Sequence, residues 1–231
     1  MKITIIGGHG KIAQLVTPLL AAAGHDVTSV VRNPDQISDV EDLGATGSLG
    51  DVAELDGAGI QKLIAGSDAV LWSAGAGGGS PERTYAVDRD AAIRTMDAAV
   101  AEGVDRFVMV SYVGSGRDEV PEDNPFYHYA KAKAEADDHL RGTTLGWTIL
   151  GPGQLTEEQG TGRIEFGDHV TQGETSRANV AEVIAQAIGR SDLSGATIHF
   201  RDGDIVIWEA LDVVARQATG DTVAPLREGQ N

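Results

Sequence analysis

Two overlapping Tyr-x-x-x-Lys pairs, Tyr127 with Lys131 and Tyr129 with Lys133, are the residues of this chain best suited to acid–base chemistry. A spacing of four residues places a phenol and an ammonium on the same face of a helix. There we expect the ammonium to lower the pKa of the phenol and to orient a ribose. The phenol can then give a proton to a carbonyl oxygen that receives hydride.

The helical phase of the two pairs favours Tyr129 and Lys133. Their face continues through Ala132, Ala136 and Leu140, which are apolar and suited to packing on a sheet. The face of the other pair continues through two acidic residues, which favour solvent. We therefore assign Tyr129 as proton donor and Lys133 as the residue that binds ribose and tunes the phenol, and keep the other pair as the surface alternative.

Ser111 completes the predicted catalytic set. It follows a short apolar run, residues 104–110, that is typical of a buried strand. A serine at the carboxyl end of such a strand could position the substrate oxygen, and a strand-terminal cap is its alternative role. The neighbouring Tyr112 is a second candidate for proton donor.

A glycine-rich turn stands between the first apolar run, residues 1–6, and a helical pattern of leucines. Its spacing is Gly7-x-x-Gly10-x-x-Ala13, with Lys11 and Ile12 between the last two. In a strand–turn–helix unit such small residues permit a sharp turn, the approach of a pyrophosphate to the backbone and close helix packing. The phosphates then lie at the positive end of the helix. We expect this turn to bind a dinucleotide, with a purely structural turn as the alternative.

Arg32 and Asp51 follow the second and third predicted strands, residues 25–31 and 44–49. In dinucleotide folds a carboxylate at the end of the second strand accepts from the ribose 2′-hydroxyl, whereas arginine suits a 2′-phosphate. Arg32 therefore favours NADP(H) over NAD(H), and Lys11 could add a second cation near that phosphate. We expect Asp51 to accept from the adenine amino group and to cap the following helix.

A run of small residues begins at the end of the fourth predicted strand, residues 69–73. It starts with Ser73, Ala74 and Gly75 and ends at Gly79. Ligands bind at the carboxyl ends of strands in this architecture. We expect this backbone to lie against ribose and nicotinamide, with a flexible linker as the alternative.

Apolar strands alternate with helical patterns along the first 150 residues. This order is typical of a parallel sheet covered by helices on both faces. We predict an α/β chain with a doubly wound Rossmann sheet in the usual strand order. The whole chain, residues 1–231, is expected to be one domain, with a cofactor core at 1–150 and a small substrate-side extension at 151–231.

The composition argues against several classes of partner. The formal charge is −17, from 35 acidic and 18 basic residues, which would repel nucleic acid. We expect no membrane span, because no apolar run approaches about 20 residues, and we read no signal peptide and expect a cytoplasmic location. The six histidines lack the spacing of metal ligands and there is no cysteine, so no metal site is expected.

Together these motifs resemble one family. The chain looks like an atypical short-chain dehydrogenase/reductase, and within that superfamily it is similar to the NmrA-like and biliverdin reductase B-like NAD(P)H-binding proteins. The resemblance implies a Rossmann fold, NADP(H) held by the glycine turn and Arg32, and reductase activity on a small carbonyl, quinone or flavin-like acceptor. The residues that carry it are Gly7, Gly10, Ala13, 31–34, 50–51, 73–75, 87–88, 103–108, Ser111, Tyr129 and Lys133.

Three functions remain open from the sequence. The first is an NADPH-dependent reductase with a small-molecule substrate. The second is a non-catalytic redox sensor that binds NADP(H) and reports to a partner, and the third is an isomerase or dehydratase that retains its cofactor. The oligomeric state is open between monomer and homodimer.

Overall fold

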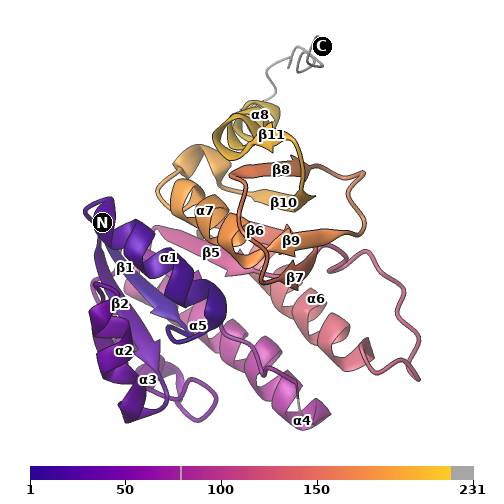
Figure 1. Ribbon diagram of the computed structural model, residues 1–231. Coiled ribbons are helices and arrows are strands. Elements are labelled where there is room, and N and C mark those ends of the chain that lie inside the picture. The colour runs from indigo at the N-terminus through magenta and orange to yellow at the C-terminus, as the bar shows by residue number, and fades with distance from the viewer. Residues whose placement is uncertain (79, 220–231) are drawn as a thin grey trace.

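A nine-stranded sheet forms the centre of the computed structural model, which describes residues 1–78 and 80–219 (Figure 1). The strand order is β11-β8-β10-β6-β5-β4-β1-β2-β3. Strands β1 to β6 and β10 run parallel, and β8 and β11 add antiparallel pairs at one edge. The predicted doubly wound sheet and its usual order of six strands are confirmed. The parallel strands are β1 (Lys2–Ile6), β2 (Asp26–Val31), β3 (Thr46–Leu49), β4 (Ala69–Trp72), β5 (Arg106–Val110), β6 (Gly146–Pro152) and β10 (Ala196–Asp202).

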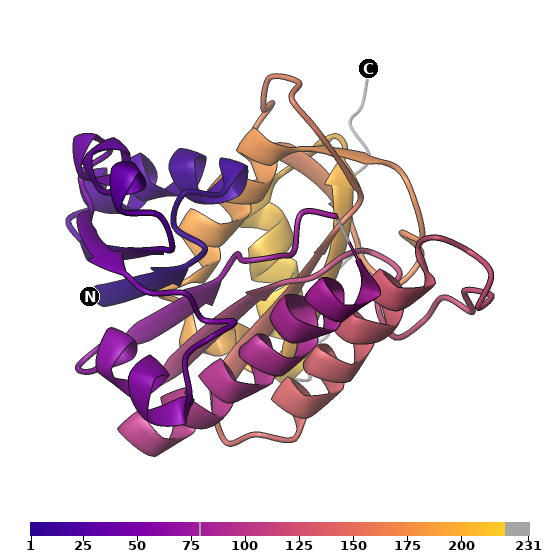
Figure 2. The same cartoon turned by 90° about the horizontal axis from the view of Figure 1, so that it is seen from below.

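Helices cover both faces of the sheet, as Figures 1 and 2 show. One apolar core joins the sheet to α1 (Lys11–Ala22), α7 (Arg177–Ala187) and α8 (Ile207–Thr219). The other joins it to α3 (Gly57–Ile64), α5 (Ala92–Glu102) and α6 (Tyr127–Arg141). The short α2 (Ile37–Asp42) precedes β3. Every side chain of β4 is buried, including Trp72, because this strand lies between the two helical layers.

The helical segment at residues 81–102 contains a break in its regularity. It consists of α4 (Pro81–Thr84), a π-helical stretch (Tyr85–Ala91) and α5. The wider π turn is a local departure that the apolar periodicity does not reveal. It places Asp88 in the interior, where the side chain is 1% exposed.

Short strands lie in residues 151–176, at the start of the predicted substrate-side extension. One of them is β8 (Arg163–Phe166). Two further strands, β7 (Gln154–Thr156) and β9 (Glu174–Ser176), pair in parallel as a separate two-stranded sheet. The last described strand, β11 (Ile205–Val206), pairs with β8. The first and last parts of the chain therefore share one sheet.

A buried guanidinium fastens the C-terminal part to the central strands. Arg106 of β5 donates to the carbonyl of Gly146 at 2.6 Å and to the Thr148 hydroxyl at 2.7 Å. It also donates to the carbonyls of Ala187 and Ile188 at the end of α7. Burial lowers the pKa of Arg106 to about 10, so the side chain stays charged at neutral pH.

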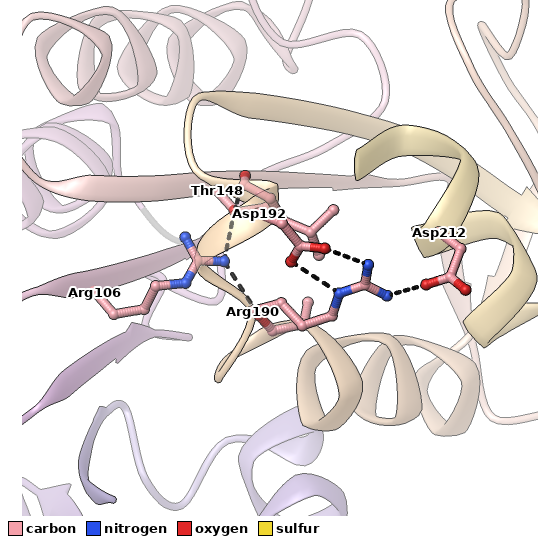
Figure 3. Close-up of polar contacts among 7 residues, drawn as sticks. Arg106, Thr148, Arg190, Asp192 and Asp212 are labelled. Carbon is pink, nitrogen blue, oxygen red and sulfur yellow. Dashed lines mark hydrogen bonds and ion pairs between the residues drawn. The ribbon is translucent and has the colours of Figure 1, made fainter. Parts of the chain in front are cut away.

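A second arginine extends this connection to α8. Arg190 pairs with Asp192 at 2.7 Å and with Asp212 of α8 at 2.6 Å (Figure 3). The turn after α7 is thus joined both to the last helix and, through Arg106, to the middle of the sheet. That the whole chain is one domain stays a prediction.

We predict that Arg106→Met lowers the free energy of unfolding by about 3 kcal/mol, because it leaves several buried acceptors without a donor. Urea denaturation followed by tryptophan fluorescence and circular dichroism measures the change. Both probes should report one shared transition. The exposed Arg83→Met is the matched control and should shift stability by less than about 0.5 kcal/mol. An equally small effect of Arg106→Met would contradict the prediction.

Candidate cofactor and active site

Two adjoining hollows lie at the carboxyl ends of the parallel strands. The larger is a cleft of about 730 Å³, and the smaller has about 320 Å³. Their shared lining is Gly10, Ser73, Ala74 and Gly75, so the glycine turn and the end of β4 separate them. An elongated ligand could extend from one hollow into the other along this backbone.

The glycine turn has the geometry that a dinucleotide needs. Gly7 adopts φ +85°, and a Cβ there would lie 2.7 Å from the Cα of Ala74. A Cβ on Gly8 would lie 2.6 Å from Ser29, so this glycine, which the sequence analysis did not assign, allows the turn to pack on β2. Ile12 and Ala13 are buried in the first turn of α1, and Gly10 supplies no capping side chain. The first N–H groups of α1 are therefore free to bind phosphate.

The smaller hollow contains the residues expected to bind adenosine. Arg32 and Asp51 both line it. Asp51 accepts from the backbone N–H of Ala53 at 3.0 Å. Its predicted role as the cap of α3 is wrong, because Asp56 caps that helix by accepting from Gly59.

Lys11 does not lie beside Arg32 as expected. It lines the larger cleft, and its ammonium pairs with Glu157 at 2.6 Å. The side chain of this first residue of α1 extends toward the segment after β7, whereas Arg32 follows β2. A second cation at a 2′-phosphate is therefore not supplied by Lys11 in this structure.

Ser73, Ala74 and Gly75 form the wall between the hollows. A Cβ on Gly75 would lie 3.1 Å from the Asp88 carboxylate, so a larger residue would crowd this buried group. Gly77 and Gly78 have positive φ and line the larger cleft. Gly79 lies outside the described residues.

The two Tyr-x-x-x-Lys pairs lie in different surroundings. Tyr129 and Lys133 line the larger cleft, and Lys133 is 1% exposed. The Lys133 ammonium donates to the carbonyl of Val110 at 2.7 Å, at the end of β5. Tyr127 and Lys131 do not line the cleft: the Lys131 ammonium donates to the Tyr127 hydroxyl at 3.4 Å, and Tyr127 also donates to a neighbouring glutamate and packs against the ring of His128. The structure therefore places the expected pair, and not its alternative, at the cleft.

The charge around Tyr129 differs from the expectation. Desolvation raises the pKa of the Tyr129 phenol, and the carboxylates of Asp88 and Asp137 raise it further. The shift is opposite to the expected lowering by Lys133, chiefly because the phenol is desolvated and in addition because two carboxylates lie near it. The phenol therefore carries its proton at neutral pH, which is the state that a proton donor requires, although the raised pKa makes it a weaker acid.

Ser111 is held by a residue that the sequence analysis missed. Its hydroxyl lines the cleft and donates to Asp137 of α6 at 2.5 Å. Ser115 donates to the same carboxylate oxygen at 2.5 Å, and the other oxygen has no hydrogen-bond partner among residues 1–78 and 80–219. Burial raises the pKa of Asp137, while Lys133 opposes the shift. The spacing of four residues from Lys133 to Asp137 is the signal that could have indicated this residue.

Asp88 belongs to the residues that carry the resemblance, but the sequence predicted no role for it at the site. Its carboxylate accepts from the N–H of Ala76 at 3.0 Å and lines the cleft. Burial raises the pKa of Asp88, and Lys133 lowers it in part. Burial in turn lowers the pKa of Lys133, and Asp137 and Asp88 counteract that effect. The ammonium is thus faced by carboxyl groups from two separate helical segments.

Apolar side chains complete the larger cleft. Phe126 is 42% exposed, and it packs 5.2 Å from the Tyr129 ring. Leu155 lines the cleft from β7. Tyr112 packs against Phe126 but is absent from the lining of this cleft, which weakens its candidacy as proton donor.

Comparison with known proteins decides the family. Residues 7–191 match the model of a family described as NAD(P)H-binding. The chain belongs to this NAD(P)H-binding family. A nicotinamide dinucleotide is therefore its cofactor, and the family is of the atypical short-chain dehydrogenase type.

Several relatives share most of the chain. "Uncharacterized sugar epimerase YhfK" of Bacillus subtilis is 32% identical and covers 91% of this chain and 99% of its own. A solved structure from Bacillus halodurans, named "Putative NAD-dependent epimerase/dehydratase", has a TM-score of 0.85 at 31% identity and covers 92% of this chain and 99% of that chain. The oxidoreductase ylbE of Lactococcus lactis has a TM-score of 0.83 at 28% identity, with coverage of 93% and 96%.

The described residues contain neither a candidate metal site nor a candidate membrane-spanning helix. No group of three or more histidine, cysteine, aspartate or glutamate side chains within residues 1–78 and 80–219 could hold a metal ion. Across the same residues, no helix is both long and apolar enough to cross a membrane.

We predict that Asp137→Ala lowers the free energy of unfolding by about 3 kcal/mol. The substitution deprives the hydroxyls of Ser111 and Ser115 of their acceptor and leaves the buried Lys133 with less compensating charge. Thermal and urea denaturation measure the loss. The matched control is Asp138→Ala, which removes an exposed ion pair with Arg141 and should cost less than about 1 kcal/mol. Equal effects of the two variants would show that the buried network contributes no more than the exposed pair.

Proposed function

We propose that the protein is an NADP(H)-dependent reductase of a small carbonyl, quinone or flavin-like acceptor. The observation that carries the proposal is the Tyr129 side chain, which lines the cleft together with the buried Lys133 and Ser111. A protonated phenol in a cleft that the glycine turn also lines is placed to give a proton to a carbonyl or quinone oxygen that receives hydride.

Each residue has a distinct role in this proposal. The bound dinucleotide supplies hydride to the acceptor. Tyr129 gives a proton to the acceptor oxygen, and Lys133 holds ribose and keeps positive charge near the phenol. Ser111 orients the acceptor oxygen, with its own hydroxyl held by Asp137. Phe126 and Leu155 exclude water from the apolar part of the acceptor.

We further propose that Arg32 selects NADP(H). It lines the smaller hollow after β2, where the other charged side chains are Asp51, Glu54 and Arg83. Arginine binds a phosphate through paired hydrogen bonds. The glycine turn, through Gly7, Gly10, Ile12 and Ala13, would contact both cofactors alike.

We expect Arg32→Ala to weaken NADPH binding about tenfold and to leave NADH binding within about twofold, because only NADPH carries the 2′-phosphate. Titration of protein fluorescence with each dinucleotide gives the dissociation constants. Tighter binding of NADH than NADPH by the wild-type protein would contradict the proposed preference.

We expect Tyr129→Phe to reduce turnover by about a hundredfold or more, because the variant lacks the proton donor. NADPH consumption is measured with quinones, flavins and small aldehydes, and the dissociation constant of NADPH should change less than about twofold. Tyr127→Phe is the matched control and should retain wild-type turnover. Full turnover by Tyr129→Phe would show that another group supplies the proton.

A redox sensor is the alternative that uses the same cofactor residues without catalysis. Tight NADPH binding with no turnover on any acceptor would favour it. The catalytic proposal is preferred because Tyr129, Lys133 and Ser111 converge on one cleft, which cofactor binding alone does not require.

The names of two relatives favour a second candidate, an isomerase or dehydratase that retains its dinucleotide. If such a reaction begins by removing a proton from a substrate hydroxyl, Tyr129 would have to act as a base. The raised pKa of the phenol keeps it protonated at neutral pH and so opposes that step. An epimerase would convert a sugar substrate with no net consumption of NADPH, which separates the two functions in one assay.

A further inference from the structure

Three charged side chains from different parts of the chain meet at one oxygen atom. The Glu157 Oε1 atom accepts from the Lys11 ammonium at 2.6 Å and from Arg177 Nη1 at 2.9 Å. Lys11 is the first residue of α1, Glu157 follows β7, and Arg177 is the first residue of α7. Lys11 and Arg177 both line the larger cleft.

The cluster of Lys11, Glu157 and Arg177 lies next to the turn that is expected to bind the cofactor. Lys11 directly follows Gly10 in the turn whose free N–H groups can bind phosphate. Arg177 reaches the same carboxylate oxygen from the start of α7, which packs beside α1. A dinucleotide on the glycine turn would therefore bring its pyrophosphate next to these two cations.

The chemistry of the cluster is that of a phosphate site. A single anionic oxygen lies between an ammonium and a guanidinium, the two groups with which proteins bind phosphoryl oxygens. The hydrogen bond from Lys11 lowers the pKa of Glu157, with Arg177 contributing, so its carboxylate is charged at neutral pH. In a chain of charge −17, two cations that converge on a cleft are a marked local exception.

Because Lys11 and Glu157 are largely exposed, a bound anion could replace Glu157 as the partner of Lys11 and Arg177. The side chains of Lys11 and Glu157 are 69% and 64% exposed, so their ion pair contributes little to stability. Arg177 is 20% exposed and is held closer to the cleft. A pyrophosphate carries more charge than one carboxylate and could take both cations from Glu157.

We propose that the Glu157 carboxylate occupies the place of a cofactor pyrophosphate oxygen, and that Arg177 is a cofactor-binding residue supplied by the C-terminal part of the chain. Binding of the dinucleotide displaces Glu157 from Lys11 and Arg177. The carboxylate thus competes with the cofactor within the molecule and lowers its affinity. The proposal rests on dinucleotide binding and does not depend on the reductase activity.

The test compares dissociation constants for NADPH and NADH at low ionic strength, measured by fluorescence titration of the full chain. Glu157→Gln should tighten the binding of both dinucleotides about threefold, because it removes the competing charge. Arg177→Gln should weaken the binding of both about tenfold. Glu158→Gln, which changes the adjacent carboxylate, is the matched control and should leave both constants within about 1.5-fold.

The opposite signs of the two effects separate this mechanism from a general structural role. Unchanged or weaker binding by Glu157→Gln would overturn the proposal, as would unchanged binding by Arg177→Gln. Tightening for NADPH alone would overturn the assignment to the pyrophosphate, which both cofactors share. If Arg177→Gln fails to fold, the exposed Glu157→Gln still decides the outcome. Absence of turnover by the wild-type protein would refute the proposed function and leave this test intact.

Discussion

The buried ammonium of Lys133 is the constraint on which the active site depends. An ammonium loses its hydration on burial and is stable there only beside acceptors and negative charge. The acceptor is the Val110 carbonyl at the end of β5, and the facing carboxyl groups are Asp88 and Asp137. One side chain therefore requires a strand end, the π-helical stretch and α6 to fit together.

The consequences extend outward from this group. Asp137 accepts a hydrogen bond from Ser111 at the cleft, and Asp88 accepts one from the backbone N–H of Ala76 after β4. The opposite wall comes from β7 and α7, which contribute Leu155 and Arg177. Arg106 connects the end of α7 to the middle of the sheet and keeps this wall in place. The glycine turn, the residues proposed for acid–base chemistry and the proposed acceptor wall are thus connected by one set of contacts.

Local patterns predicted the parts of the structure that depend on neighbours in sequence. The strand–helix alternation predicted the sheet, and helical phase distinguished Lys133 from Lys131 without reference to any tertiary contact. The sequence predicted no site role for Asp88 and Asp137 because an acidic residue on a helix ordinarily faces solvent. The pKa of Tyr129 was expected to move the wrong way because its main cause, desolvation, depends on tertiary burial, and one of the carboxylates that add to the shift comes from another helical segment. Strands as short as β7 and β9 carry too little periodicity to be recognised.

The π-helical stretch at Tyr85–Ala91 is a place where the helix can accommodate an insertion or a deletion. A π turn holds more residues than an α turn of the same helix, so it is equivalent to a short insertion that the helix absorbs. An ancestral helix without it would present a different side chain to the interior at the level of Asp88. Gain or loss of a single codon here could therefore add or remove a carboxylate beside Lys133 while α5 and its packing stay unchanged. Insertions and deletions in this stretch offer a simple route by which homologous chains could diverge in chemistry on a common scaffold.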